Sequence, residues 1–318
     1  MKIYVWGTGC AAGDLMDAGL APGQVTAFLD SEARGGSFLG RPVLRPEAVD
    51  TAGEYYILVA SRHVEEIARQ AAVCGIGEER LLFLRDNWTL TDRNTDYGRA
   101  REFLPPALLS SLQTPPRAIR PLPPTPGSPL TERDLEGDYV RVRTLELLCA
   151  ELGEVPGAAA ELGVYRGGFA RCLNALLPER TLYLFDSFEG FDRQESLGEK
   201  TGFVQAHRNT TEERVLAAMP HPEQVILRRG FFPATAVGLE NESFALVSLD
   251  VDLEESTLSG LRWFLPRMRE GGFLLLHDYN NPKLPGVKAA LSRYETETGE
   301  RLRAVPLCDV NGTLVICW

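Results

Sequence analysis

The pattern of hydrophobic and polar positions in the second half of the chain predicts a β-α-β unit. Two apolar runs, FALVSLD ending at Asp250 and GGFLLLHD ending at Asp278, have the length and composition of buried parallel strands. The segment STLSGLRWFLPRMRE between them has apolar residues at helical spacing: Leu258, Leu261, Leu265 and Met268. A short right-handed crossover makes the two strands neighbours, with their carboxyl ends at the same edge of a sheet.

Residues 138–318 extend this pattern into a mostly parallel sheet. A predicted helix, YVRVRTLELLCAEL, precedes seven strand-like runs: GAAAELG, TLYLFD, QVILRRG, FALVSLD, GGFLLLHD, RLRAVPL and TLVICW. Helical segments such as FARCLNALL and TEERVLAAM separate the first five runs, which predicts parallel pairing. The last two runs are joined by CDVNGT, whose Asn311-Gly312 pair predicts a tight reversal. A seven-stranded, mostly parallel sheet with an antiparallel carboxyl-terminal hairpin is the plan of the Rossmann-like class I methyltransferase fold.

Residues 1–92 predict a smaller Rossmann-like α/β domain. KIYVW, VTAFLD, YYILVA and RLLFL have strand-like patterns, and helical patterns occur over residues 11–19 and in HVEEIARQAAVCG. The composition changes over residues 93–137, where PPALLSSLQTPPRAIRPLPPTPGSP is too rich in proline for the interior of a helix or sheet. We expect this segment to be a semi-rigid linker or a lid over the following domain.

Charge and composition narrow the classes of function. The 318 residues include 33 basic and 44 acidic side chains, a formal net charge of −11, which argues against a surface for nucleic acid or anionic membranes. The start lacks the charged leader of a secretory signal, and no apolar run approaches the roughly 18 residues of a membrane span. We therefore expect a cytoplasmic protein with a small-molecule partner. The six cysteines lack CxxC or zinc-ligand spacing, so we expect reduced thiols.

Polar side chains follow the two strands of the predicted β-α-β unit. Asp250 and Asp278, with Asp252 and His277 beside them, come together at the carboxyl edge of the predicted sheet, where open α/β folds bind ligands. Acids that converge at this edge indicate a metal site or a proton acceptor. The alternative is that each aspartate only caps the helix or loop that follows it.

A second set of candidate residues lies at the first two strands of residues 138–318. Glu161 closes a strand in ELGVYRGGF, and Gly163, Gly167 and Gly168 form the turn into a helix, where a ligand can approach the backbone closely. Asp186 ends the next strand, at the position from which a carboxylate accepts hydrogen bonds from ribose hydroxyls. Because Glu161 disfavours a phosphate, a cationic or zwitterionic ligand fits better, and S-adenosylmethionine carries both an amino group and a sulfonium. With Asp186, this favours an adenosine-containing cofactor. The alternative is that the glycines serve packing and Asp186 caps a helix.

Five motifs appear in the order in which one enzyme family has them: ELGVYRGGF, LFDSFEGF, RRGFFPAT, SLDVDLEEST and HDY. Over residues 138–318 the chain resembles the macrocin O-methyltransferase (TylF-like) family. That family uses S-adenosylmethionine, and usually Mg²⁺, to methylate sugar hydroxyls, often on natural-product glycosides. The resemblance implies a glycoside or nucleotide-sugar acceptor and a homo-oligomer.

The resemblance also implies roles for individual residues. Asp250, His277 and Asp278 would be metal ligands, and Asp252 would be the general base, with His277 as the other candidate base. The cofactor would contact the first two motifs and one strand end, at Glu161, Gly163, Tyr165, Arg166, Gly167, Asp186, Ser187 and Asp250.

His277 departs from the family pattern, which commonly has an acid at this position. Imidazole is a poorer ligand for the hard Mg²⁺ ion than a carboxylate is. Mg²⁺ is the expected metal, and a softer divalent ion or no metal at all are the alternatives.

The amino-terminal glycine loop leaves two other functions open. WGTGCAAG places Gly7, Gly9 and Gly13 after the first strand, and Asp30 ends the second, but Ala12 departs from the spacing of the dinucleotide fingerprint. One alternative is therefore an NAD-dependent sugar oxidoreductase, and another is a noncatalytic nucleotide-binding scaffold. The favoured hypothesis is a metal-assisted, S-adenosylmethionine-dependent O-methyltransferase that acts on a sugar or glycosylated natural product.

Overall fold

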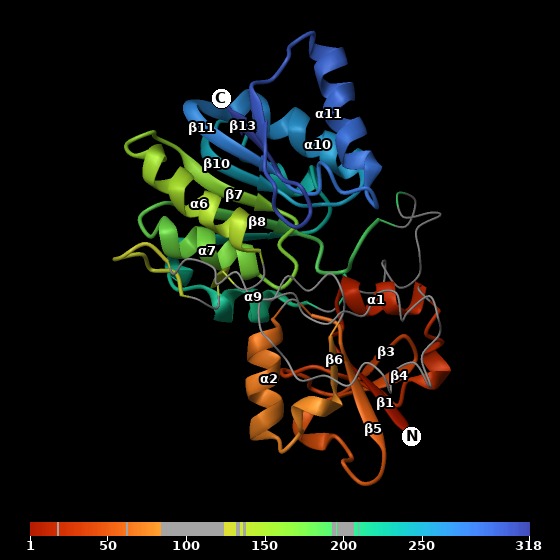
Figure 1. Ribbon diagram of the computed structural model, residues 1–318. Helices are drawn as coiled ribbons and strands as arrows, with labels where there is room; N and C mark the ends of the chain where they lie inside the picture. The colour runs from red at the N-terminus through yellow and green to blue at the C-terminus, as the bar shows by residue number, and fades with distance from the viewer. Residues whose placement is uncertain are drawn as a thin grey trace. The chain divides into compact units, whose positions relative to one another are not determined.

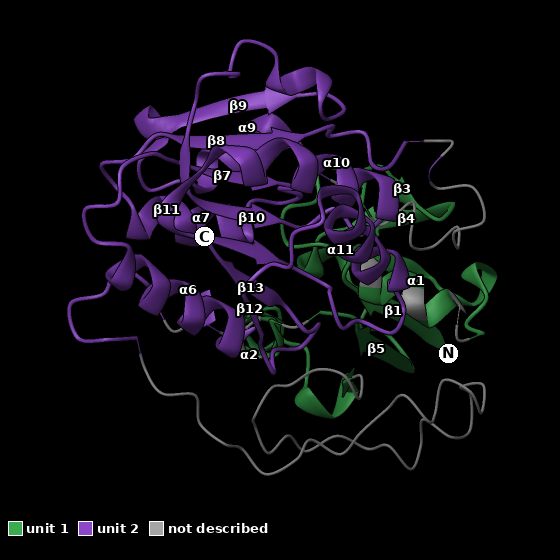
Figure 2. Ribbon diagram, turned by 90° about the horizontal axis from the view of Figure 1, so that it is seen from above, with its two compact units in different colours: residues 1–122, 198–209 green, residues 123–197, 210–318 purple. Residues whose placement is uncertain are grey.

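The computed structural model describes residues 1–17, 19–61, 63–83, 124–131, 134–135, 138–192, 195, 207–208 and 210–318. The chain divides into two compact units, coloured green and purple in Figure 2. Unit 1 is Met1–Leu122 with Gly198–Asn209, and unit 2 is Pro123–Leu197 with Thr210–Trp318. Both units have a mostly parallel sheet with helices (Figure 1), so the predicted α/β class is confirmed.

The predicted linker or lid, residues 93–137, lies mostly outside the described residues. Two of its described residues, Leu130 and Leu135, are buried in the hydrophobic core of unit 2. The boundaries 1–92, 93–137 and 138–318 therefore stay a prediction, and the end of the predicted linker packs as part of the second unit.

Unit 1 is built on a described sheet of six strands in the order β3-β4-β2-β1-β5-β6. Along the chain its elements are β1 (Lys2–Trp6), α1 (Cys10–Asp17), β2 (Ala27–Leu29), β3 (Ser37–Phe38), β4 (Arg41–Leu44), β5 (Tyr55–Val59), α2 (Val64–Val73) and β6 (Leu81–Phe83). All pairs are parallel except β3 with β4. The four predicted strands are β1, β2, β5 and β6, whereas β3 and β4 are too short for a hydrophobic period to reveal them.

Alternating side chains along β1 explain why unit 1 has helices on both faces of its sheet. Val5 lies in one hydrophobic cluster with Leu15 of α1, and Tyr4 lies in the other cluster with Ile67 of α2. Successive strand residues point to opposite faces, so a strand that is apolar throughout needs cover on both sides.

Unit 2 is built on a described sheet of seven strands in the order β12-β13-β11-β10-β7-β8-β9. Its elements are α6 (Tyr139–Leu152), β7 (Ala158–Leu162), α7 (Gly168–Leu176), β8 (Leu182–Asp186), α9 (Glu212–Ala218), β9 (Val225–Arg229), β10 (Phe244–Leu249), α10 (Glu254–Phe264), β11 (Met268–Leu276), α11 (Pro285–Thr298), β12 (Ala304–Pro306) and β13 (Leu314–Cys317). β13 runs antiparallel to its neighbours β11 and β12, and the other pairs are parallel. The predicted Rossmann-like class I methyltransferase plan with its carboxyl-terminal hairpin is confirmed.

The crossover helix between β10 and β11 is shorter than its hydrophobic spacing predicts. α10 ends at Phe264, a 3₁₀ turn covers Leu265–Arg267, and Met268 is the first residue of β11. The assignment of Met268 to the helix was wrong because Pro266 lacks an N–H donor and its ring crowds the preceding turn.

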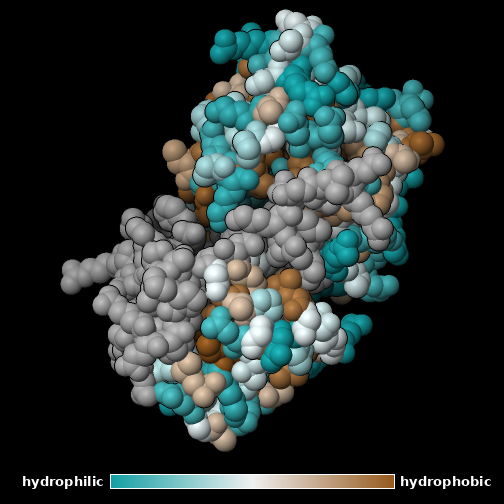
Figure 3. All heavy atoms as spheres, turned by 90° about the vertical axis from the view of Figure 1, so that its right-hand side faces the viewer, coloured by the Kyte–Doolittle hydropathy of each residue, from teal (hydrophilic) through white to brown (hydrophobic). Residues whose placement is uncertain are grey.

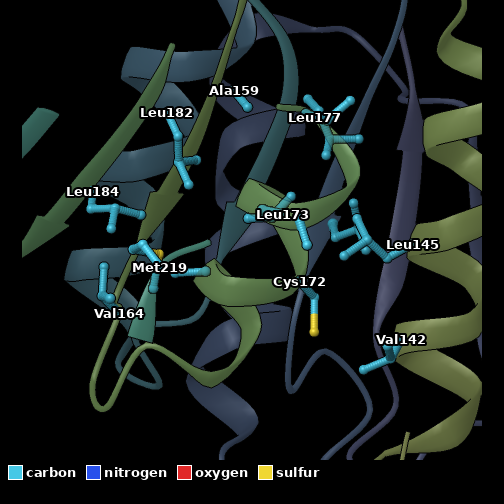
Figure 4. Close-up of a cluster of buried hydrophobic side chains, with 14 of the residues drawn as sticks. Val142, Leu145, Ala159, Val164, Cys172, Leu173, Leu177, Leu182, Leu184 and Met219 are labelled. Atoms are coloured by element: carbon cyan, nitrogen blue, oxygen red, sulfur yellow. The ribbon is translucent and has the colours of Figure 1, made fainter. Parts of the chain in front are cut away.

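Helices cover both faces of the sheet in unit 2, with α6 and α7 on one face and α10 and α11 on the other (Figure 1). On the first face, Leu145 of α6, Leu173 of α7 and Leu182 of β8 belong to one buried cluster (Figure 4). Burial of each such side chain contributes roughly 1.5–3 kcal/mol, so the strands beneath form a rigid support for the loops at their ends.

The polarity of the surface and the length of the helices agree with what the composition predicts. Hydrophilic side chains predominate over much of the face drawn in Figure 3, with hydrophobic ones interspersed. None of the described helices is long and apolar enough to cross a membrane. The five cysteines for which the structure describes the side chain are free thiols, as the sequence predicts.

Backbone hydrogen bonds hold the strand ends of unit 2 in register. The N–H groups of Gly163, Asp250 and His277 each donate to a carbonyl of the neighbouring strand, at 2.9, 2.8 and 2.9 Å. Because β7, β10 and β11 are parallel neighbours, the residues that follow them meet at one edge. The predicted convergence of the loops after β10 and β11 is therefore observed.

Candidate active site

Asp250 and Asp278 converge on the imidazole of His277. His277 Nδ1 lies 2.9 Å from Asp250 Oδ1 and 2.7 Å from Asp278 Oδ2. His277 and Asp278 are buried, and Asp250 is partly buried. Two carboxylate acceptors around one nitrogen assign the proton to Nδ1, which therefore donates to both acids.

Arg141 completes this cluster, and the sequence interpretation missed it. Its Nη1 donates to Asp250 Oδ2 at 3.0 Å and its Nη2 to Ser248 Oγ at 3.3 Å. The guanidinium lies over the ring of Phe169, 4.0 Å from its centroid. The available signal was weak: Arg141 precedes the buried Leu145 by one helical turn, so a charged side chain occupies the apolar face of α6.

The contacts set the pKa values of these groups. Burial by itself raises the pKa of Asp250, but the charges of His277 and Arg141 outweigh it and hold the pKa below its ordinary value. Burial and Arg141 lower the pKa of His277, yet Asp250 and Asp278 bring it up to about 9. Burial also raises the pKa of Asp278, and His277 reverses that shift. At neutral pH the imidazole is a cation between two anions.

Asp252 lies beside this ion cluster in a different electrostatic setting. Burial raises its pKa well above the ordinary value, and the charges of Asp278 and Asp250 and a hydrogen bond with Asp278 add to the shift. Asp252 and Asp278 have left-handed backbones, with φ of 63° and 58°. Non-glycine residues held in this region concentrate at functional sites. A carboxylate with a raised proton affinity is suited to accept a proton.

Gly163 joins the loop after β7 to the loop after β10. Its φ is 88°, and a Cβ at this position would lie 1.9 Å from the carbonyl oxygen of Asp250. Only glycine fits here. The packing role that the sequence left open for the glycines is therefore observed at Gly163. The N-cap of α7 is Gly167, with a φ of 80°, so the first N–H groups of this helix come directly after the loop that follows β7.

Asp186 holds two loops by their backbones. Its Oδ2 accepts from the N–H groups of Val164 and Tyr165, both at 2.8 Å, and its Oδ1 accepts from the N–H of Phe188 at 2.7 Å. A carboxylate has about four acceptor positions, so these bonds leave room for another donor. The sequence interpretation offered ribose binding or helix capping and did not foresee this clamp.

Three further residues expected to contact the cofactor, Tyr165, Arg166 and Ser187, lie in the same two loops. Ser187 Oγ donates to the carbonyl of Gly190 at 2.7 Å, which closes the turn after β8. The Arg166 guanidinium lies over the ring of Tyr165, 5.3 Å from its centroid. The structure therefore gathers all the predicted cofactor residues of the first two motifs at the ends of β7 and β8.

Glu161 is the buried acid at this edge. It is 1% exposed, and its Oε2 has no hydrogen-bond partner among the described residues. Burial raises its pKa well above the ordinary value, although Arg141 opposes the shift. An unpaired polar atom in the interior costs free energy unless a ligand satisfies it. A ligand with a cationic or donor group fits this position.

Two clusters in the described residues have the spacing of a metal site, and both contain His277. One is the predicted set with Asp250 and Asp278, and the other adds Asp138 and Asp309 to His277, with candidate ligand atoms within 4.8 Å of one another. Asp309, from the loop between β12 and β13, accepts from the N–H and the hydroxyl of Thr313. Sequence patterns gave no sign that this loop reaches the edge.

The glycine loop of unit 1 has a structural explanation. Gly7 has a φ of 128°, and a Cβ there would lie 2.2 Å from the carbonyl oxygen of Ala60. Asp30, the acid of the imperfect fingerprint, accepts from the Thr8 hydroxyl at 2.9 Å and from the N–H of Glu32 at 3.0 Å. These contacts hold the loop against β5 and the turn after β2.

Comparisons with known proteins identify relatives of unit 2. The family model described as macrocin O-methyltransferase (TylF) matches residues 140–316. The 8-demethyl-8-(2,3-dimethoxy-α-L-rhamnosyl)-tetracenomycin-C 4′-O-methyltransferase of Streptomyces olivaceus is 29% identical over 174 residues, which are 50% of this chain and 64% of that protein. The mycinamicin III 3″-O-methyltransferase of Micromonospora griseorubida is 29% identical over 167 residues, 46% of this chain and 63% of that protein. The matches thus span less than two thirds of the relatives' own length.

Solved structures with a similar fold include two methyltransferases. The O-methyltransferase NovP has 23% sequence identity and a TM-score of 0.46, over 56% of this chain and 79% of NovP. The calicheamicin methyltransferase CalS11 has 21% identity and a TM-score of 0.47, over 57% of this chain and 79% of CalS11.

Proposed function

Because this chain belongs to the macrocin O-methyltransferase family, whose model matches residues 140–316, we propose that it is an S-adenosylmethionine-dependent O-methyltransferase. Glu161 carries the proposal: a buried carboxyl group with an unpartnered oxygen lies at the end of β7, beside the start of α7. S-adenosylmethionine offers an ammonium donor and a sulfonium cation to such a group. The family's cofactor and this unpaired acid therefore fit each other.

The proposed cofactor contacts follow the two loops at the ends of β7 and β8. Glu161 would hold the cationic part of the cofactor, the remaining acceptor position of Asp186 would accept from a ribose hydroxyl, and the loop backbone would supply N–H groups. The full set of residues in this proposal is Glu161, Gly163, Tyr165, Arg166, Gly167, Asp186, Ser187 and Asp250.

The proposed acceptor is a hydroxyl of a sugar, either on a glycosylated natural product or on a nucleotide sugar. The names of the curated relatives support the glycoside, since they describe O-methylation of a rhamnosyl tetracenomycin and of mycinamicin III. The acidic net charge of −11 also favours a neutral acceptor over an anionic one.

In the proposed mechanism, Asp252 accepts the proton of the acceptor hydroxyl once it has released its own proton to solvent. When bound, the cofactor would supply the electrophilic methyl group to the acceptor oxygen, and its sulfur would keep the electron pair of the broken carbon–sulfur bond. Asp252 suits its role because burial and its acidic neighbours raise its affinity for a proton, and the cluster around His277 keeps Asp278 beside it.

Mg²⁺ assistance, which the family resemblance implies, is left out of this mechanism because the donor set does not fit the ion. Mg²⁺ requires oxygen ligands in near-octahedral geometry. Here one of the three expected ligands is an imidazole, and its Nδ1 faces both carboxylates as a hydrogen-bond donor. No step of the proposed mechanism is therefore assigned to a metal ion.

Calorimetry with S-adenosylhomocysteine tests the proposed function through Glu161. We expect the full chain to bind this product and Glu161→Gln to weaken binding at least about tenfold, because a hydrogen bond to a charged group contributes about 1.5–3 kcal/mol. Glu146→Gln is the matched control, since Glu146 is also a buried acid of unit 2 but is paired with Arg143. Its affinity should match that of the unaltered protein.

Other results contradict the proposal. Binding of NAD without binding of S-adenosylhomocysteine supports the oxidoreductase, and binding of neither supports the scaffold. Where S-adenosylhomocysteine binds, incubation of S-adenosylmethionine with a panel of glycosides should give a product heavier by one methyl group, and mass spectrometry identifies the acceptor.

A further inference from the structure

All four carboxylate oxygens of Asp250 and Asp278 have nitrogen donors. Asp250 Oδ1 lies 2.9 Å from His277 Nδ1, and Asp250 Oδ2 lies 3.0 Å from Arg141 Nη1. Asp278 Oδ2 lies 2.7 Å from the same His277 nitrogen, and Asp278 Oδ1 accepts from Asn281 Nδ2 at 2.6 Å. N–H groups therefore point at each oxygen that a cation between these acids would need.

The orientation of the His277 ring is incompatible with a metal at this position. A ligating imidazole presents a lone pair to the ion, whereas an Nδ1 that contacts two carboxylate oxygens presents its hydrogen. The ring is buried, and its place is held by backbone pairing, because the His277 N–H donates to the carbonyl of Leu249 at 2.9 Å. A cation between Asp250 and Asp278 would have to displace the imidazole from both acids.

Arg141 adds a fixed positive charge on the other side of Asp250. A guanidinium keeps its charge throughout the range in which proteins are stable. Arg141 is buried and held by Ser248, by Phe169 and by Asp250 itself. A divalent ion bound to Asp250 would be repelled by this neighbour, and repulsion between like charges is strong where water is excluded.

We infer that this chain replaces the divalent cation of its family by two side chains, Arg141 and His277, which occupy the carboxylate oxygens of Asp250 and Asp278. The inference rests on the proposed function, because it concerns the same edge of the sheet. Arg141 and His277 are positioning residues: they hold the two acids in place and leave Asp252 to receive the proton. The methyl transfer then proceeds without a metal ion between Asp250 and Asp278.

Titration of the protein with Mn²⁺, followed by electron paramagnetic resonance, tests this inference. Mn²⁺ prefers oxygen ligands as Mg²⁺ does, and its signal changes when it binds. We expect the unaltered protein to bind no Mn²⁺ between Asp250 and Asp278 at millimolar concentration, so Asp309→Asn, which removes an acid of the other candidate cluster, should show no bound ion. His277→Asp should bind about one ion per chain, because a third carboxylate replaces the N–H donor. The matched control His277→Asn removes the imidazole without adding an acid and should not bind.

Two results would overturn the inference. One is stoichiometric binding of Mn²⁺ by the unaltered protein that persists in Asp309→Asn, in which the other candidate cluster lacks one acid. The other is the absence of Mn²⁺ binding in a His277→Asp protein that still binds S-adenosylhomocysteine by calorimetry. Calorimetry on the same proteins also separates the two proposals, since a failure to bind S-adenosylhomocysteine contradicts the methyltransferase function and not the absence of a metal between Asp250 and Asp278.

Discussion

At the scale of single residues, the proposed chemistry depends on Asp252, whose proton affinity is set by its neighbours. An isolated aspartate is ionised at neutral pH and is a weak base. Burial, the charges of Asp278 and Asp250, and the hydrogen bond to Asp278 together raise the pKa of Asp252. His277 and Arg141 shift Asp250 in the opposite direction. Acids two positions apart in the sequence therefore have different roles.

Asp252→Asn should abolish most of the turnover and leave the cofactor site intact. We expect the rate of methyl transfer to fall about 100-fold or more, the usual contribution of a general base. Affinity for S-adenosylhomocysteine, measured by calorimetry, should stay unchanged. Asp309→Asn is the control, because Asp309 reaches the same edge but bonds to Thr313, and its turnover should change little. Undiminished turnover in Asp252→Asn would remove this residue from the mechanism.

At the scale of elements, the site depends on close packing between the loops that follow β7, β8 and β10. Gly163 lets the turn after β7 lie against the carbonyl of Asp250, and Asp186 binds the same turn through two N–H groups. α6 then inserts Arg141 beside Asp250 from outside the sheet. The cofactor loop and the acid cluster therefore support each other.

Gly163→Ala tests this coupling of loops. We expect the free energy of unfolding, measured by urea denaturation, to fall by about 2 kcal/mol or more, because alanine is strained at a left-handed φ and its Cβ meets a carbonyl oxygen. Binding of S-adenosylhomocysteine should weaken as well. Gly168→Ala is the matched control, since no atom lies within 4 Å of its added Cβ. Equal stability of the two variants would show that the contact at Gly163 contributes nothing.

At the scale of the whole molecule, the two units have separate hydrophobic cores. Leu58 lies in the core of unit 1 and Leu246 in that of unit 2, and both are fully buried. The predicted cofactor residues all lie in unit 2. A ligand that binds only a native unit raises the stability of that unit.

Scanning calorimetry should therefore resolve two transitions, of which S-adenosylhomocysteine raises one. Leu246→Ala should lower the transition that responds to the ligand, and Leu58→Ala the other, since each substitution costs about 2–5 kcal/mol in a packed core. A single transition that shifts as a whole in both variants would instead indicate that the units unfold together.

Much of the fold was predictable because its signals are local. The helical period of YVRVRTLELLCAEL corresponds to α6, and the apolar runs that end near Glu161, Asp186 and Asp250 correspond to β7, β8 and β10. Short strands such as β3 and β4 contain too few residues for a period. The end of α10 was misjudged because hydrophobic spacing continued through Pro266 into β11.

The sequence by itself determined the alternation of strands and helices, and with it the edge that carries Glu161 and Asp250, because each strand end is marked by its own neighbours in the chain. Only the tertiary structure decided what lies between the acids. Arg141 stands 109 positions from Asp250, and the direction in which His277 donates depends on distances between side chains of different loops. A hydrogen bond between distant segments leaves no local pattern in the sequence. The sequence alone therefore does not distinguish a metal site from an ion cluster that replaces it.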